Sequence, residues 1–393
     1  MIGIIKWCWA PVLLAVLAQP IQKGAPTFAD DIRPMLAKKC VACHSTGGMG
    51  PFNLQTYEQV RKRADLVRLV CLTGQMPPTD ARSDIGQLTP HQPLSPAELL
   101  AVQDWFRLGM PEGRKTPPLS GVGRRLPYVS KHVASYLVGK GQMIPAEGRS
   151  TRTVFRVPMP PGGMSYLGGF SYQPDSPKAV RQVMLAVQKP GKPVPFTSAG
   201  VVPNTPVISW SEGFFTWGGS GGSIRTDRGD QLWMQVRAVP TGKPEPASGL
   251  LTLVRQATPA RVQSKSLGNR TFVIEADSQV VLQNEWVLER DIDLLSAIPE
   301  AKFTTEQVRL VAETPDGTKE TVFLVLTWDP VWPGAYNFSK PVRLKKGTRL
   351  SYEAVINNTR HGHNAEDVPP KRVTFGPNQT EELFWCHLTY IAR

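Results

Sequence analysis

The sequence has no run of lysine and arginine interleaved with aromatic residues, although its net charge is +13. A nucleic-acid-binding surface typically combines clustered basic side chains with aromatic ones, so we expect no nucleic-acid partner. The basic balance favours an acidic protein partner or an anionic membrane surface instead. Glycine (34 residues) and proline (37 residues) are spread through the chain, which indicates the turns of β-rich structure rather than disorder.

Beyond the N-terminus, the chain has no apolar stretch long enough to cross a bilayer. At the N-terminus, "WCWAPVLLAVLA" follows Lys6 and ends in small residues, with Val16 and Ala18 at the cleavage positions. A positive flank, a short apolar core and small residues are typical of a secretory signal peptide. We predict that residues 1–18 are cleaved and that the mature protein is exported, for example to the periplasm. An uncleaved N-terminal anchor is the alternative.

The chain has few cysteines, five in all, and Cys8 lies in the signal peptide. The sequence "CVACH" at 40–44 is the haem attachment pattern. In that pattern the thiols of Cys40 and Cys43 bond the two vinyl groups of one haem, and His44 is the proximal iron ligand. Zinc would require a second cysteine pair, which the chain lacks. We therefore predict one covalent haem c.

The sixth iron ligand is predicted to be Met76. It stands in "LTGQMPPT" just before two prolines, which stiffen a loop. A methionine thioether opposite histidine raises the reduction potential and suits electron transfer. Met49, in the glycine-rich loop after the motif, is the rival, whereas Met35 and Met110 are interpreted as packing residues.

Three segments around the motif have helical patterns: "FADDIRPMLAKKC", "TYEQVRKRADLVRLV" and "SPAELLAVQDWFRLGM". In the third, Ser95 is expected to be the N-cap and Glu98 to complete a capping box. We predict that residues 27–115 form a small all-α cytochrome c domain, followed by a linker at 116–144.

From about residue 145 the pattern changes to short strands broken by Gly, Pro, Asn and Asp, such as "RTVFRVPMP", "QLWMQVRAV" and "RLSYEAVINN". This spacing is typical of β-sandwiches and jelly rolls. We predict a multidomain chain in which the cytochrome precedes two all-β jelly-roll or β-sandwich domains, at 145–258 and 259–393.

The chain resembles a known family along nearly its whole mature length. The blocks "CHSTGGMGPFNLQTYEQV", "GQMPPT" and "LSPAELLAVQDWFRLGMPEG" are similar to the cytochrome module that precedes copper type II, ascorbate-dependent monooxygenase-like domains. The blocks "IPAEGRSTRTVFRVP", "QVRAVPTGKPEPASGLLTL" and "TWDPVWPGAYNFSKPVRLKKGTRLSYEAVINNT" resemble successive parts of that family, which includes peptidylglycine hydroxylating monooxygenase. The resemblance implies two jelly rolls, each holding one copper across a solvent cleft.

At the first copper site, the resemblance implies two adjacent histidines on the strand matching "KAVRQVMLAV". This chain has Arg181 and Gln182 there, and Arg237 at the position of the third histidine. Arginine is always protonated and has no lone pair for a metal, and amide ligation is weak.

At the second copper site, the resemblance implies a His-x-His and a methionine. The matching positions carry Glu300-Ala301-Lys302 and Leu383. Because redox copper prefers imidazole and thioether ligands, we expect no copper at either site. Arg181, Gln182, Arg237, Glu300 and Lys302 are hypothesised to form a polar network in the emptied sites, with an Arg–Glu or Lys–Glu pair compensating buried charge.

The sequence favours an exported cytochrome c that carries electrons, with the β domains serving for docking or assembly. Its partner would be an acidic redox protein or a larger respiratory complex. One alternative is a copper-dependent hydroxylating monooxygenase with relocated ligands, using His361, His363 (near Glu366 and Asp367) and His387. Another is a ligand-binding module with the haem as sensor. Its cleft would be lined by tryptophans, which more often serve in packing: Trp210, Trp217, Trp233, Trp286, Trp328, Trp332 and Trp385. Cys71 and Cys386 are either buried thiols or a disulfide.

Overall fold

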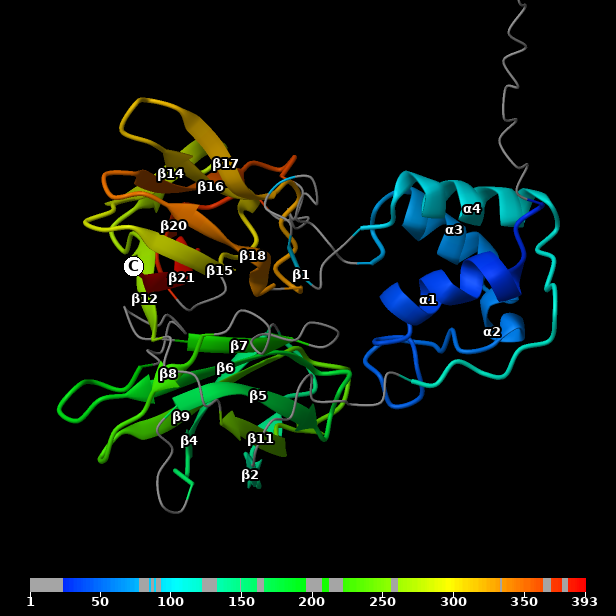
Figure 1. The fold of residues 1–393 in the computed structure, drawn as a ribbon, viewed down its shortest axis with the longest axis horizontal. Coiled ribbons are helices and arrows are strands. Elements are labelled where there is room, and N and C mark those ends of the chain that lie inside the picture. Colours follow the sequence, from blue (N-terminus) through cyan, green and yellow to red (C-terminus); the bar gives the residue numbers. More distant parts are fainter. Residues whose placement is uncertain are drawn as a thin grey trace, which may run out of the picture.

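Most of the chain is placed in a computed structural model (Figure 1). It describes residues 24–77, 85, 88–89, 93–121, 133–148, 150–160, 166–195, 207–211, 222–255, 261–332, 334–362, 369–376 and 381–393. The predicted signal peptide, residues 1–18, lies outside these ranges. Within them, no helix has the length and apolar character that crossing a membrane requires.

The N-terminal part of the chain folds into short helices on one side of the β-strands (Figure 1). They are a π-helical turn, η1 (Phe28–Ile32), and four α-helices: α1 (Arg33–Lys39), α2 (Tyr57–Arg61), α3 (Ala64–Leu72) and α4 (Pro96–Arg107). The capping box predicted for α4 is confirmed, because the Ser95 side chain accepts from the Glu98 N–H and the Glu98 side chain accepts from the Ser95 N–H. The helices pack around a core that includes Phe28, Leu36 and Trp105.

The fold class predicted from the sequence is wrong for this region. Strands make up 44% and helices 13% of the described residues, and the four short α-helices do not amount to an all-α cytochrome c domain at 27–115. The segment "TYEQVRKRADLVRLV" is not one helix, because α2 ends at Arg61 and α3 begins at Ala64. In addition, β1 (Leu88–Thr89) leaves the helices and pairs with β18 (Tyr336–Leu344). Part of this segment thus pairs with the exposed edge of a sheet that is distant in the sequence.

The β-sandwich part of the prediction fits the structure. The first sandwich has two four-stranded sheets. One has the order β2 (Val133–Val138), β11 (Gly249–Arg255), β5 (Tyr166–Pro174), β8 (Ile224–Arg225). The other has the order β4 (Thr151–Val157), β9 (Gln231–Ala238), β6 (Val180–Gln188), β7 (Val207–Ser211). Alternate residues of β6, among them Val183, Leu185 and Val187, fill the core between the sheets, as the period of a strand requires. β2 lies inside the predicted linker, as does β3 (Met143–Ile144), which pairs with β10 (Glu245–Pro246).

The second sandwich has one five-stranded and one four-stranded sheet. The first has the order β1, β18, β15 (Ile292–Glu300), β21 (Trp385–Ala392), β12 (Val262–Gly268). The second has the order β14 (Ser278–Val287), β19 (Arg349–Asn358), β16 (Thr305–Glu313), β17 (Lys319–Val325). β13 (Val273–Ile274) pairs with β20 (Val373–Thr374). The predicted strand "RLSYEAVINN" corresponds to β19, and its partner β14 alternates between half-buried and exposed residues along its whole length.

The two sandwiches touch through the outer face of β6. Met184 and Ala186 pack there against Ile298 of β15 and Ala335 of the segment before β18. All four side chains are at most 2% exposed, so at this point the sandwiches are in apolar contact that solvent does not reach.

Candidate functional site

The CVACH motif forms a tight turn directly after α1. Cys40 is the C-cap of that helix, and the backbone N–H groups of Cys43 and His44 donate to the Cys40 carbonyl at 3.1 and 2.8 Å. The turn brings Cys40, Cys43 and His44 to the wall of one cavity of about 520 Å³. Met76, more than thirty residues along the chain, lines the same cavity. The structure therefore brings together all four residues that the sequence assigned to the haem.

The other walls of this cavity are largely apolar. They include Phe52, Leu54, Leu66, Val67, Val70 and Cys71. Cofactor pockets of similar volume are typically lined by apolar side chains with a few convergent polar groups. Two thiols, an imidazole and a thioether in an apolar cavity are a donor set that fits haem c.

The hydrogen bonding of His44 suits a metal ligand. Its Nδ1 lies 2.9 Å from the Phe52 carbonyl, and because a carbonyl only accepts, Nδ1 carries the proton. The lone pair is then on Nε2, the atom available to iron. Burial lowers the pKa of His44, and the Phe52 contact opposes this only in part. The imidazole is thus neutral at pH 7, as metal binding requires.

The glycine-rich loop "GGMG" at 47–50 packs tightly on the motif. A Cβ on Gly50 would lie 2.7 Å from His44 Nδ1, and one on Gly48 would lie 2.3 Å from the Cys43 carbonyl oxygen. Both positions require glycine, because no side chain fits between the loop and the motif. The loop thus fixes the orientation of His44.

Both candidate axial methionines reach the cavity. The backbone N–H of Met76 donates to the Val70 carbonyl at 3.0 Å, which fixes its loop against α3. Met49 is 6% exposed and also lines the cavity, so Met76 stays a prediction. Met35 lies in the helix core and Met110 packs against that core.

Among the described residues, the two cysteines outside the motif are buried thiols. Cys71 lies in the helix core and Cys386 in the core of the second sandwich, and both are free. Burial raises the pKa of Cys71 to about 11. Within the motif, burial and the neighbouring Cys71 and Cys43 raise the pKa of Cys40 to about 12.

Arg181 and Gln182 do not simply point to opposite faces of β6, because the strand is irregular there. β6 pairs with β9 as Val180↔Ala238 and then Gln182↔Arg237, which leaves Arg181 as an extra residue, a β-bulge. Val180 therefore joins the core, while Arg181 is half-buried and lines the cavity of Cys43 and His44. Gln182 is 1% exposed, and neither atom of its amide has a hydrogen-bond partner among the described residues.

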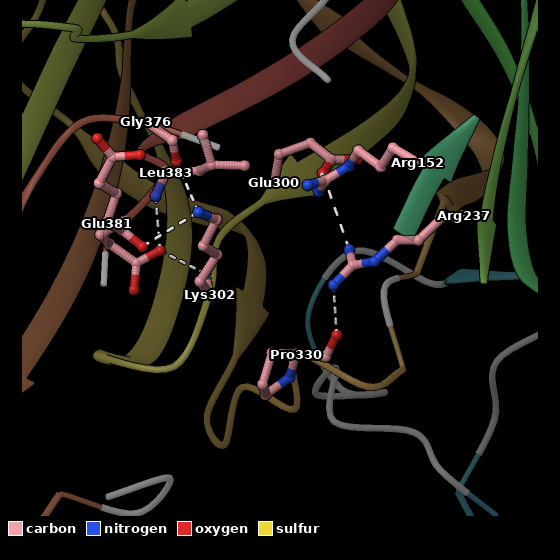
Figure 2. Close-up of polar contacts among 9 residues, drawn as sticks. Arg152, Arg237, Glu300, Lys302, Pro330, Gly376, Glu381 and Leu383 are labelled. Carbon is pink, nitrogen blue, oxygen red and sulfur yellow. Dashed lines mark hydrogen bonds and ion pairs between the residues drawn. The ribbon is translucent and has the colours of Figure 1, made fainter. Parts of the chain in front are cut away.

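Arg237 and Glu300 form part of an ion cluster between the sandwiches (Figure 2). Glu300 Oε2 lies 2.8 Å from Arg152 Nη2 and 3.9 Å from Arg237 Nη1, and Glu300 is fully buried. Arg237 also donates to the Pro330 carbonyl at 2.5 Å. Burial, with a smaller effect of Arg152, lowers the pKa of Arg237 to about 10, so it stays charged at neutral pH. The hypothesised Arg–Glu pair is therefore present in the structure.

Lys302 belongs to a separate group, as Figure 2 shows. Its ammonium donates to the carbonyls of Gly376 at 2.6 Å and Glu381 at 3.1 Å. Its backbone N–H donates to Glu382, whose other carboxylate oxygen accepts from Thr304 N–H at 2.9 Å. Burial lowers the pKa of Lys302 to about 8.

Leu383 is fully buried beside Trp385 and Phe375. In the described structure, the five polar residues that were hypothesised to form one network have different partners. They divide among the cavity at the CVACH motif (Arg181), the ion cluster (Arg237 and Glu300), Lys302 with its own partners, and a buried amide at Gln182.

The histidines considered as relocated copper ligands do not come together in the described structure. His361 is exposed, and His363, Glu366 and Asp367 lie outside the described residues. His387 is 1% exposed in the second sandwich, with Nδ1 3.1 Å from Ser266 Oγ. Among the described residues, no three His, Cys, Asp or Glu side chains form a group that could hold a metal.

Most of the tryptophans considered for a ligand cleft take part in packing. Trp210 and Trp328 lie in the sandwich cores, and Trp217 is outside the described residues. Trp332 instead lines the cavity at the CVACH motif. Sequence reasoning missed Arg152 as a site residue and considered Trp332 only for a ligand cleft, because their partners lie far away in the sequence.

Comparisons with known proteins add little. No protein-family model and no curated protein matches the chain. Among solved structures, a two-domain protein of unknown function from Bacteroides fragilis is 11% identical. The match covers 66% of this chain and 94% of that one, with a TM-score of 0.20. The STIV MCP is 8% identical, with 67% and 97% covered and a TM-score of 0.22. Likenesses this weak carry no argument about fold or function.

Proposed function

We propose that this chain is an exported c-type cytochrome that transfers electrons, with one covalent haem c bound by Cys40, Cys43 and His44 and with Met76 as the sixth ligand. The observation that carries this proposal is the convergence of these four residues on one apolar cavity of about 520 Å³. The bound haem would supply a one-electron redox centre. Around it, the chain holds His44 in the tautomer needed for iron and excludes water with apolar side chains.

The two sandwiches serve, in this proposal, as a scaffold derived from a copper monooxygenase fold that no longer binds copper. The ion cluster supports the loss: two guanidinium groups around Glu300 repel a dication. The direct contact of Arg152 with Glu300 bridges the sandwiches where the resemblance implies an open cleft.

The redox partner is proposed to be acidic, either a separate protein or a subunit of a respiratory complex. The net charge of +13 supports this, since opposite charges raise the encounter rate and salt screens the attraction. An anionic membrane surface is the other possible contact.

Expression in a bacterium with the haem c maturation system tests the proposal. The wild-type chain is expected to keep haem after denaturing electrophoresis and to be reversibly reduced by a mild chemical reductant. The double variant Cys40→Ala/Cys43→Ala is expected to lose the covalent haem while the sandwiches keep their β-sheet circular dichroism. A wild-type chain that matures without covalent haem would overturn the proposal.

A further inference from the structure

The cavity at the CVACH motif is closed in part by residues of the two sandwiches. Lys178, just before β6, and Arg181, near its start, line the cavity from the first sandwich, and Trp332, which precedes β18, lines it from the second. The haem site proposed above is thus built from three distant parts of the chain. A cytochrome segment that was only joined to the sandwiches by the chain would not have residues of the sandwiches in the wall of its cavity.

Arg181 is held in place against this cavity. Its Nη1 donates to the Lys178 carbonyl at 2.7 Å, and its guanidinium carbon lies 5.3 Å from the centre of the Trp332 ring. At that distance the cation and the ring face attract each other. Its Nε is buried and has no hydrogen-bond partner in the described part of the chain. The guanidinium is therefore fixed by one hydrogen bond and one ring contact.

Arg181 lies on the same cavity wall as the motif. It lines the cavity together with Cys43 and His44, and burial lowers the pKa of its guanidinium group. Since arginine stays protonated at every physiological pH, this positive charge is permanent.

We propose that Arg181, supported by Trp332, raises the reduction potential of the haem, which makes the first sandwich a regulator of the redox centre. The inference rests on the function proposed above. Oxidation of the iron from ferrous to ferric adds one positive charge to the haem, and a fixed cation beside a poorly solvated cavity disfavours that addition. The residue that stands at a former copper-ligand position thus serves the haem instead.

Four variants of the haem-loaded full chain test the inference. Arg181→Gln removes the charge, Arg181→Lys keeps it, and Trp332→Leu removes the ring that supports it. Arg156→Gln is the matched control, because Arg156 is an exposed residue of β4 in the same sandwich and does not line the cavity. For each variant, the haem content per chain is measured first, and the midpoint potential is then measured by spectroelectrochemical titration.

Arg181→Gln is expected to lower the ratio of reduced to oxidised haem at a fixed applied potential by about threefold to tenfold, where tenfold corresponds to 59 mV for one electron. Trp332→Leu is expected to lower the ratio of reduced to oxidised haem by a smaller factor. The ratios of the Arg181→Lys and Arg156→Gln variants are expected to stay close to that of the wild type. Should Arg181→Gln fail to accumulate, Lys178→Gln removes a charge from the same wall and is expected to shift the ratio in the same direction.

Two negative results have different meanings. If haem-loaded Arg181→Gln has the same reduction potential as Arg156→Gln, the proposed role of Arg181 is overturned and the haem proposal stays intact. If Arg181→Gln does not accumulate, an unchanged reduction potential in Lys178→Gln has the same meaning. A wild-type chain without haem would instead overturn the proposed function itself.

Discussion

Arg152 of β4 and Glu300 of β15 form an ion pair of 2.8 Å that links the two sandwiches, 148 residues apart in the sequence. Glu300 is fully buried, and Arg237 lies 3.9 Å from the same carboxylate oxygen. A buried carboxylate thus lies between two guanidinium groups, and the sandwiches are joined by this charge cluster and by the apolar contact of Met184 with Ile298.

The substitution Glu300→Gln is expected to destabilise the protein by about 3–5 kcal/mol, because it leaves the buried Arg237 and the partly buried Arg152 without the carboxylate that they share. The measurement is urea unfolding followed by tryptophan fluorescence. Glu285→Gln is the control, since Glu285 pairs with Arg349 at the surface, where an ion pair is worth at most about 1 kcal/mol. Equal urea midpoints for Glu300→Gln and Glu285→Gln would contradict the view that the ion cluster stabilises the protein.

His387 is expected to make the protein less stable in acid. Burial lowers its pKa from 6.5 to about 3, so between these pH values the unfolded chain binds a proton that the native protein does not. The free energy of unfolding therefore falls as the pH falls from 6.5, by up to about 1.4 kcal/mol per pH unit from this residue. His387→Gln is expected to flatten the dependence of the unfolding free energy on pH between about pH 7 and 4. If the slope of unfolding free energy against pH is the same in His387→Gln as in the wild type, the buried His387 is not the cause of the acid sensitivity.

Met76 and Met49 are distinguished by a pair of alanine variants. With Met76 as the axial ligand, Met76→Ala is expected to lose the sulfur-to-iron charge-transfer absorption and to lower the reduction potential, because a thioether opposite histidine favours the reduced iron. Met49→Ala is expected to keep both properties. The opposite pattern would assign the ligand to Met49, which lines the same cavity.

Gly50→Ala tests how the glycine-rich loop positions His44. The added methyl group would lie 2.7 Å from His44 Nδ1, so the ring or the loop must shift. We expect a lower yield of haem-loaded protein and a changed Soret spectrum. Gly24→Ala is the control, because a Cβ there meets no atom within 4 Å. Haem loading of Gly50→Ala equal to that of Gly24→Ala would show that the loop does not constrain the ligand.

The features that the sequence predicted are local ones. The CVACH motif, the capping box of Ser95 and Glu98, and the alternating pattern of β19 each depend on residues within a few positions of one another. The sequence did not predict the pairing of Leu88–Thr89 with β18 or the bulge at Arg181, because both depend on which strand pairs with the segment in the folded protein. For the same reason, the hypothesis of an Arg–Glu pair was right while Arg152, the nearer partner of Glu300, went unrecognised.

The most direct test of the account is the iron and copper content of the full chain after haem maturation, incubation with copper and desalting. The account predicts one iron per chain, bound as covalent haem, and no copper. One or two tightly held copper ions per chain would contradict the proposal that the sandwiches, with Arg237, Glu300 and Lys302 in place of copper ligands, bind no copper, and would favour a copper monooxygenase with relocated ligands. A chain without iron would contradict the central claim that Cys40, Cys43 and His44 bind haem.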